Sequence, residues 1–160
     1  MKKTKIYLDT TIINFIYADA HDYRDSTLVF FERLVKPKKA DVYISNVVFD
    51  EINKTHNIVK KNKLLDAVKK YDLEVLESNP ESIRLSKIYL AEKIIPANKV
   101  EDAEHIGVAT VFEMDILLSW NFQHLANYSR KQKVKLVNQR EKYFYPLDII
   151  SPLELEYERE

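Results

Sequence analysis

The sequence has 160 residues, 46% hydrophobic and 31% charged, so residues 1–160 have the length and composition of one globular domain. The 25 basic and 25 acidic side chains give a formal net charge of zero, so bulk charge does not indicate a nucleic-acid-binding protein. The lack of cysteine excludes disulfides and thiolate metal sites. Because the sequence has no signal-peptide core and no apolar run of roughly 18 residues, we expect a cytoplasmic protein without membrane contact.

The first predicted element is a short apolar strand that ends on a carboxylate. Residues 6–8 are of strand-forming types, Asp9 follows, and a segment with helical spacing begins at Thr10 and Thr11, either of which could cap the helix. A carboxylate at the end of a buried strand lies where α/β folds place their chemistry. Aspartate is also common in turns and caps. On these residues alone, Asp9 is either a functional residue or a turn or cap residue.

Beyond this stretch the chain alternates between helical and strand periodicities. Helices are expected at residues 22–35, 46–52, 58–70, 80–93 and 100–112, with shorter polar helical pieces at 122–128 and 131–137. Further strands are expected at residues 42–45, 73–76, 116–119 and 147–150. Strands separated by helices require crossover connections. We therefore predict an α/β fold of three layers, α/β/α, around a mostly parallel sheet of about five strands.

Four polar residues lie after strands or at helix starts in this pattern. Asp9 ends the first strand, and Glu51 lies on the short helix after the second. Asp102 lies in the first turn of the helix at 100–112, and Asn121 follows the fourth strand. Converging carboxylates repel one another unless a cation holds them, and oxygen ligands suit Mg²⁺ or Mn²⁺. Each residue alone is more often an ordinary solvated residue, so the prediction depends on the set.

His105, Gly107, Trp120 and two groups of lysines also need an interpretation. His105, three positions after Asp102, could bind phosphate or shuttle a proton, but packing or hydrogen bonding is the commoner role. Gly107, the only glycine, costs its helix roughly 1 kcal/mol relative to alanine, for which close helix–sheet packing is a plausible reason. Trp120 could stack on a base, although burial behind the strand is the more common role. The lysine groups at 60–70 and 130–135 could contact phosphates or form solvated faces.

The ordered set of motifs resembles the PIN-domain nucleases, particularly the VapC-type toxins of toxin–antitoxin systems. Residues 7–13 resemble the family's opening strand, apolar-Asp-[Ser/Thr]-[Asn/Thr], and residues 48–52 resemble the helix that bears its glutamate. Residues 101–109 resemble the motif Asp-Ala-x-x-Ile-Ala-x-Ala. Residues 116–122 are similar to the final strand with its Thr-x-Asp-x-x-Phe turn, and residues 147–154 to the closing strand with Thr-Pro-x-Glu. The match covers nearly the whole chain in order.

The resemblance implies a PIN-like fold and a metal-dependent endoribonuclease, the toxin of a type II toxin–antitoxin pair. It also implies an RNA substrate, an antitoxin protein as partner and the homodimer common in the family. Asp9 and Asp102 would be the main ligands of Mg²⁺ or Mn²⁺, with Glu51 as the third metal ligand. Asn121 would complete the catalytic set by holding a water on the metal.

Asn121 departs from the family pattern, in which the fourth acid is usually aspartate. An amide oxygen can ligate a hard cation but carries no charge, so three carboxylates suffice for one metal ion and leave two in doubt. Asp115 precedes its strand and should lie at the opposite end of the sheet. The alternative is a catalytically impaired PIN-like module that binds RNA or protein. A phosphatase of the haloacid-dehalogenase type needs a second aspartate where Thr11 stands, which disfavours that class.

Overall fold

The computed structural model describes residues 2–19 and 21–157. Its chain opens with strand β1 (Lys5–Leu8), followed directly by helix α1 (Thr10–Phe15). The following elements are α2 (Asp22–Phe30), the π-helical turn η1 (Phe31–Val35), β2 (Asp41–Ser45), α3 (Asn46–Asn53), α4 (Ile58–Lys70) and β3 (Glu74–Leu76). The rest of the chain forms α5 (Pro80–Ala91), α6 (Val100–Val111), β4 (Ile116–Leu118), α7 (Tyr128–Arg140), β5 (Asp148–Ile150) and the 3₁₀ turn η2 (Pro152–Glu154).

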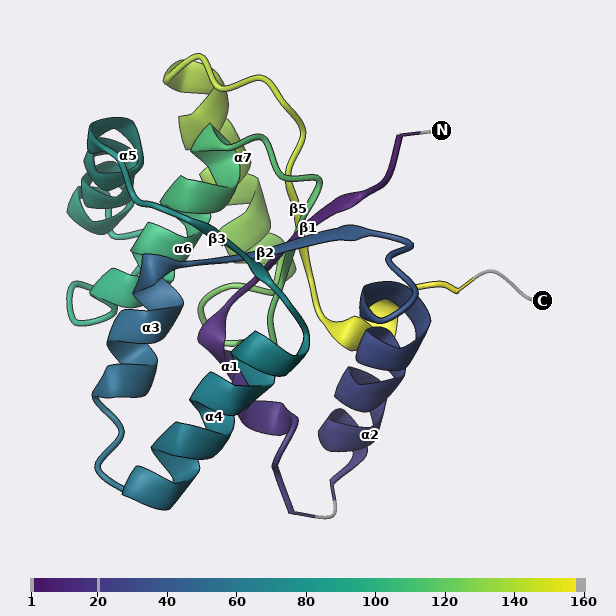
Figure 1. The fold of residues 1–160 in the computed structure, drawn as a ribbon. Helices are drawn as coiled ribbons and strands as arrows, with labels where there is room; N and C mark the ends of the chain where they lie inside the picture. Colours follow the sequence, from purple (N-terminus) through teal and green to yellow (C-terminus); the bar gives the residue numbers. More distant parts are fainter. Residues whose placement is uncertain (1, 20, 158–160) are drawn as a thin grey trace.

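The strands in the described part of the chain form one sheet of five parallel strands (Figure 1). Their order is β3-β2-β1-β4-β5, so β1 is central and pairs with both β2 and β4. Tyr7 lies opposite Tyr43 of β2 and Leu117 of β4. The direction of strand addition reverses between β1 and β4, and in open parallel sheets ligands bind outside the carboxyl ends of strands at such a reversal.

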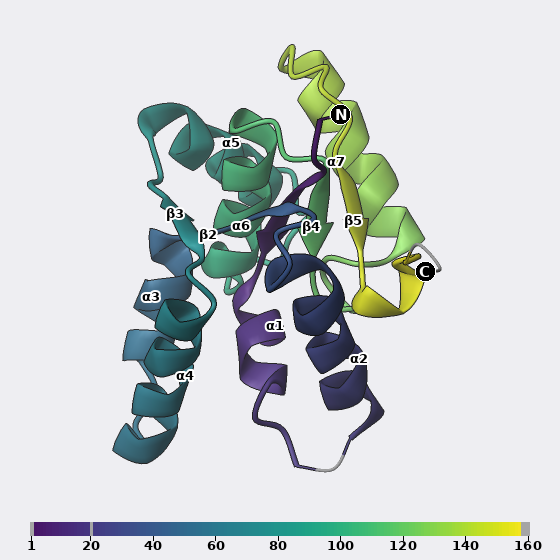
Figure 2. The ribbon, with the colours of Figure 1, turned by 45° about the vertical axis from the view of Figure 1, so that its right-hand side comes forward.

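Alternating side chains of the sheet enter two separate hydrophobic cores. Ile6 and Leu8 of β1 pack with residues of α1, α2, α3 and α4 on one face. Tyr7 packs with residues of α5, α6 and α7 on the other face. Successive residues of a strand point to opposite faces, so a short buried strand of this kind has helices on both sides. The predicted three-layer α/β/α arrangement is confirmed, and Figure 2 shows the strands side by side, from β3 at the left to β5 at the right.

Most of the predicted elements are present within a few residues, and α4 has the predicted bounds. The helix predicted at 122–128 is wrong, because that segment forms turns. The carbonyl of Asn121 accepts the N–H groups of Leu125 and Ala126, which closes one turn that is not continued. Asn127 then caps α7 by accepting the N–H of Arg130, so the piece predicted at 131–137 lies inside a single longer helix.

Gly107 lies where α6 packs closely against the backbone of α5, rather than against the sheet. A Cβ atom at this position would lie 2.5 Å from the backbone oxygen of Ser82 and 3.5 Å from the backbone nitrogen of Ser86. Close packing was therefore the right reason for the glycine, but the expected partner was wrong. Among the described residues, no helix is both long enough and apolar enough to cross a membrane.

Candidate active site

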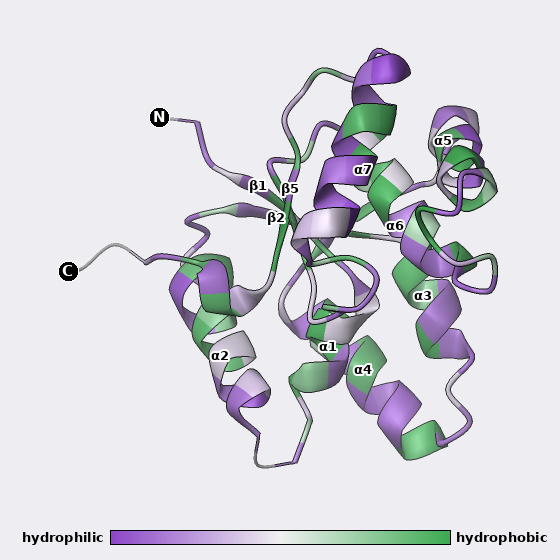
Figure 3. Ribbon diagram, turned by 180° about the vertical axis from the view of Figure 1, so that it is seen from behind, coloured by the Kyte–Doolittle hydropathy of each residue, from purple (hydrophilic) through white to green (hydrophobic). Residues whose placement is uncertain are grey.

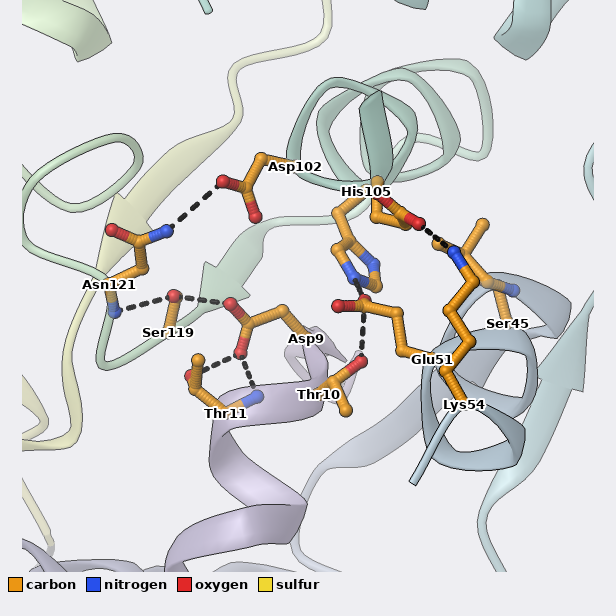
Figure 4. A network of polar contacts seen from close by, with 12 residues as sticks. Asp9, Thr10, Thr11, Ser45, Glu51, Lys54, Asp102, His105, Ser119 and Asn121 are labelled. Atoms are coloured by element: carbon orange, nitrogen blue, oxygen red, sulfur yellow. Dashed lines mark hydrogen bonds and ion pairs between the residues drawn. The ribbon is translucent and has the colours of Figure 1, made fainter. Parts of the chain in front are cut away.

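Asp9 lies at the carboxyl end of β1, where the strand order reverses, and caps α1. One of its oxygens, Oδ1, accepts the N–H of Thr11 at 3.0 Å and the hydroxyl of the same residue. The other oxygen, Oδ2, accepts the hydroxyl of Ser119, which follows β4 (Figure 4). The predicted capping role for Thr10 or Thr11 is wrong, since Asp9 itself provides the cap. Capping and a chemical role are compatible here, because the same carboxylate also faces β4.

The environment of Asp9 favours neutralisation of its charge. The side chain is only 2% exposed, and this burial raises its pKa from 3.8 to about 6. The positive charge of His105 and the hydrogen bonds from Ser119 and Thr11 oppose the rise only in part, and the charge of Asp102 adds to it. A carboxylate with a raised pKa gains more from a nearby cation than a solvated one does.

Asn121 connects the two aspartates through hydrogen bonds. Its backbone N–H donates to Ser119 Oγ at 2.9 Å, and Ser119 in turn donates to Asp9. Its side-chain Nδ2 donates to Asp102 Oδ2 at 3.2 Å, while its Oδ1 accepts the N–H of His124 at 3.0 Å. Burial raises the pKa of Asp102 as well. Figure 4 shows Asp9, Ser119, Asn121 and Asp102 around one gap at the carboxyl edge of the sheet.

Glu51 joins the same region from α3 and is held from two sides. Its Oε1 accepts the hydroxyl of Thr10 at 2.7 Å and lies 2.6 Å from Nε2 of His105 on α6. The other ring nitrogen of His105 lies 2.6 Å from the hydroxyl of Tyr7, which also contacts Ser45 at 2.7 Å. The four predicted site residues therefore lie at one edge of the sheet, and Glu51 forms its own pair with a buried histidine (Figure 4).

Glu51 and His105 stabilise each other's charged forms. Burial alone would raise the pKa of Glu51, but the hydrogen bond and charge of His105 outweigh it and lower that pKa. Burial alone would lower the pKa of His105, but the hydrogen bond and charge of Glu51 raise it. The hydrogen-bonding role predicted for His105 is confirmed. Its partners Tyr7 and Glu51 were missed, although the one-turn spacing from Asp102 on a helix was a signal that His105 lies near the acids.

The loop after β4 is fixed against α1 and α2 by aromatic packing. Trp120 is 5% exposed and stacks on Tyr23 with ring centroids 4.1 Å apart, and its indole N–H donates to Thr27 at 2.8 Å. Its backbone N–H donates to Thr11 Oγ1 at 2.9 Å. The burial expected for Trp120 is confirmed. Asp115 lies at the opposite end of the sheet, as expected, where it accepts the N–H of Lys5.

The donor atoms of the site fit a hard divalent cation by their chemistry. Asp9, Glu51 and Asp102 offer carboxylate oxygens and Asn121 an amide oxygen, and each carboxylate has at least one oxygen with a lone pair beyond its hydrogen bonds. Within residues 2–19 and 21–157, however, no three or more His, Cys, Asp or Glu side chains are already arranged to hold a metal ion. The ligand set Asp9, Glu51 and Asp102 therefore stays a prediction that rests on donor chemistry and placement.

No protein-family model matches the sequence, and no curated protein matches it significantly. Solved structures share its fold, including the following three. A chain of VapBC2 from Rickettsia felis, bound to a promoter DNA fragment, aligns with a TM-score of 0.56 and 14% identity over 91% of this chain and 98% of that one. A chain of FitAB bound to a DNA fragment aligns with a TM-score of 0.57 and 14% identity over 96% of this chain and 99% of that one. A chain of VapBC-1 from nontypeable Haemophilus influenzae aligns with a TM-score of 0.60 and 13% identity over 94% of this chain and 100% of that one.

These alignments identify the class of fold. The α/β/α arrangement is that of the PIN-domain chains of toxin–antitoxin complexes, so the resemblance to VapC-type proteins is confirmed for the fold. At 13–14% identity the likeness does not extend to particular residues or activities. The function therefore has to be argued from the site itself.

Proposed function

We propose that this chain is a metal-dependent endoribonuclease and the toxin of a type II toxin–antitoxin pair. The proposal rests on one observation above all. Asp9 and Asp102 come from distant parts of the sequence, and the hydrogen bonds of Ser119 and Asn121 link them where the strand order of a PIN-like sheet reverses. Paired carboxylates at that edge are suited to binding a cation and a phosphodiester together.

Each proposed catalytic residue has a role that its surroundings support. Bound at Asp9, Glu51 and Asp102, Mg²⁺ or Mn²⁺ would supply a Lewis acid that polarises the phosphodiester and lowers the pKa of the attacking water. Ser119 and Thr11 orient Asp9 through hydrogen bonds to both of its oxygens.

The pair formed by His105 and Glu51 gives the site a carboxylate that is ionised at neutral pH. His105 keeps Glu51 in this form by lowering its pKa, so Glu51 can accept a hydrogen bond from a water molecule. Asn121 contributes an amide that orients Asp102 without adding charge.

The second candidate function is a PIN-like module that binds RNA or protein without cutting. One observation favours it: the residue at the position of the fourth acid is Asn121, and its amide donates to an oxygen of Asp102 that a metal ion would otherwise use. A module of this kind would retain RNA in the presence of Mg²⁺ or Mn²⁺ but leave it intact.

Nuclease assays on matched variants separate the two functions. Wild type should cut single-stranded RNA with Mg²⁺ or Mn²⁺ and stop cutting in EDTA. Asp102→Asn should abolish cleavage, because it removes a charge from the metal site, whereas Asp66→Asn on the exposed face of α4 should have no effect. Asn121→Asp should keep or raise activity and increase the use of Mn²⁺. Cleavage that survives Asp102→Asn, or wild type that binds RNA but never cuts it, would contradict the nuclease assignment.

The toxin assignment has its own test. Expression of the wild type alone should arrest growth, and Asp102→Asn should relieve the arrest. A small open reading frame directly upstream, encoding a DNA-binding fold with a disordered tail, should prevent the arrest when co-expressed. Growth that is unaffected by the wild type would argue for a stand-alone enzyme.

A further inference from the structure

An open groove of about 440 Å³ lies between the end of α1 and the first turns of α4, outside the acidic site. We call it the α1–α4 groove. Its lining combines aromatic, amide and basic side chains, chiefly Phe15, Tyr17, Asn14, Asn57, Lys60 and Lys63. A volume of this size is in the range of small-ligand sites and is large enough for one nucleotide.

One residue that lines the groove, Asn14, lies on the face of α1 that borders the acidic site. Thr10 and Asn14 are four residues apart and so share a helix face, and Thr10 is the residue that donates to Glu51. At a rise of 1.5 Å per residue, the six residues of α1 span about 9 Å. A strand of nucleic acid whose phosphate lies at Asp9 and Glu51 would therefore reach the groove within one or two nucleotides.

The charge of the groove is opposite to that of the acidic site. Lys60 and Lys63 are exposed, and within the described part of the chain neither forms an ion pair. Asp19 is the carboxylate among the lining residues. Both lysines lie in the first half of α4, whose N-terminal N–H groups and dipole add positive charge. Three clustered carboxylates repel a polyanion, so positive groups beside them are needed to hold its neighbouring phosphates.

Two rings of the groove are suited to stacking. Phe15 is fixed by an edge contact with Tyr23 and a tilted contact with Trp120, whose ring centroids lie 5.6 and 5.9 Å away. Tyr17 is 43% exposed. The first turn of α4 is also hydrophobic at the surface, with Ile58 and Val59 72% and 66% exposed (Figure 3). Sites for single-stranded nucleic acid combine such rings with basic side chains along the backbone.

We propose that the α1–α4 groove binds a nucleotide of single-stranded RNA next to the scissile phosphate. The base stacks on Tyr17 and Phe15, and its phosphate is held by Lys60, Lys63 and the N-terminus of α4. The inference rests on the proposed nuclease function and adds the substrate class, a single strand that extends at least one nucleotide beyond the cleaved bond on the α1 side.

Binding measurements in an Asp102→Asn background test the groove without cleavage of the probe. The probe is a fluorescein-labelled, unstructured RNA oligonucleotide, followed by anisotropy at several salt concentrations. Lys60→Glu with Lys63→Glu should weaken RNA binding at least tenfold. The slope of log Kd against log salt concentration should fall by about 1–2. Lys69→Glu with Lys70→Glu, the same charge change at the other end of α4, should alter Kd less than twofold.

A matched pair of variants at Tyr17 tests the aromatic part of the groove. Tyr17→Ala should weaken RNA binding about fivefold or more, because stacking is lost, and Tyr17→Phe should keep the wild-type Kd. Circular dichroism and thermal melts check that every variant is folded, which we expect because the substituted side chains lie at the surface.

Several outcomes would overturn the groove assignment. They are an equal loss of binding in both lysine pairs, no loss in either groove variant, or an Asp102→Asn protein that binds no RNA. Groove variants that keep RNA binding but lose a protein partner would show that this surface docks protein. If the groove variants behave as wild type while cleavage still depends on Asp102, only the groove assignment fails. If RNA is held by the groove but never cut, only the nuclease function fails.

Discussion

The buried pair of Glu51 and His105 sets the charge of the site. Asp9, Glu51 and Asp102 carry three negative charges when ionised, and the pairing with Glu51 favours the protonated form of His105, with which the formal sum is −2. One divalent cation balances that charge. The uncharged Asn121 is consistent with this charge, because a fourth carboxylate would add a negative charge that one divalent cation does not balance. At the residue scale, we therefore expect the site to bind a single divalent metal ion.

Substitution of His105 tests this pair through stability. The raised pKa of His105 contributes stability that is full below its unfolded value of 6.5 and is lost as pH rises through the folded value. The lowered pKa of Glu51 contributes stability that is present above its unfolded value of 4.5 and is lost as pH falls. Wild type should thus be most stable between these limits.

We expect His105→Phe to flatten this pH profile and to lower the free energy of unfolding by about 1–3 kcal/mol near pH 6. Urea denaturation between pH 4 and 9 measures both effects. Tyr7→Phe, which keeps the bond between His105 and Glu51, is the control and should cost only about 1 kcal/mol with the profile retained. A profile that is unchanged in His105→Phe would contradict the paired charges.

Substitution of Asp9 should stabilise the protein, whereas substitution of His105 should destabilise it. Because burial raises its pKa to about 6, the folded state binds more protons than the unfolded state between about pH 4 and 6, so stability falls as pH rises through that window. Asp9→Asn removes this cost and should stabilise the metal-free protein at pH 7.5, by at most about 3 kcal/mol for a shift of this size. Thermal melts in EDTA at pH 4 and 7.5 measure the gain, which should be absent at the lower pH and in Asp66→Asn.

Helix α6 carries both the chemistry and the packing of its side of the sheet. Asp102 and His105 point to the site, while Gly107 lies against the backbone of α5. Between α5 and α6 there is no room for a side chain at this position, so the position of His105 beside Glu51 depends on a missing Cβ atom two residues away. At the scale of elements, the packing of α6 against α5 therefore also determines where the site residues of α6 lie.

Gly107→Ala tests that constraint. Alanine favours a helix by roughly 1 kcal/mol over glycine. Its Cβ would nevertheless lie 2.5 Å from a backbone oxygen, which must move. We expect a net loss of about 1–3 kcal/mol in the free energy of unfolding, measured by urea denaturation. A more stable variant would mean that α5 and α6 are not packed as described.

At the scale of the whole molecule, metal binding should be coupled to folding. The carboxylates converge only when β1, α3 and α6 are packed together, so Mg²⁺ or Mn²⁺ should bind the folded state and raise its melting temperature. A metal concentration of about ten times Kd would add about 1.4 kcal/mol, or about 3–5 °C for a chain of this length.

Variants locate the site responsible for that shift. Asp9→Asn should lose most of the rise, whereas Asp66→Asn should keep it, as followed by calorimetry or dye-based melts. If wild type and Asp9→Asn respond equally to the metal, the ion binds elsewhere.

Much of the fold followed from local patterns in the sequence. Each strand and the bounds of α4 could be predicted, because periodicity and capping depend on residues only a few positions apart. The segment 122–128 failed for a local reason as well. Its composition suits a helix, but Asn121 and Asn127 bind backbone N–H groups that end one turn and begin the next helix.

By itself the sequence determined the α/β class, the parallel sheet and the location of Asp9, Glu51, Asp102 and Asn121 at one edge, because strand ends and helix starts carry that information. Only the tertiary structure decided which atoms meet. Ser119 and Asp9 are 110 residues apart, and His105 and Glu51 are 54 apart. Such contacts depend on the order of strands in the sheet and on how closely two helices pack, and both are set by long-range packing that no short stretch of sequence specifies.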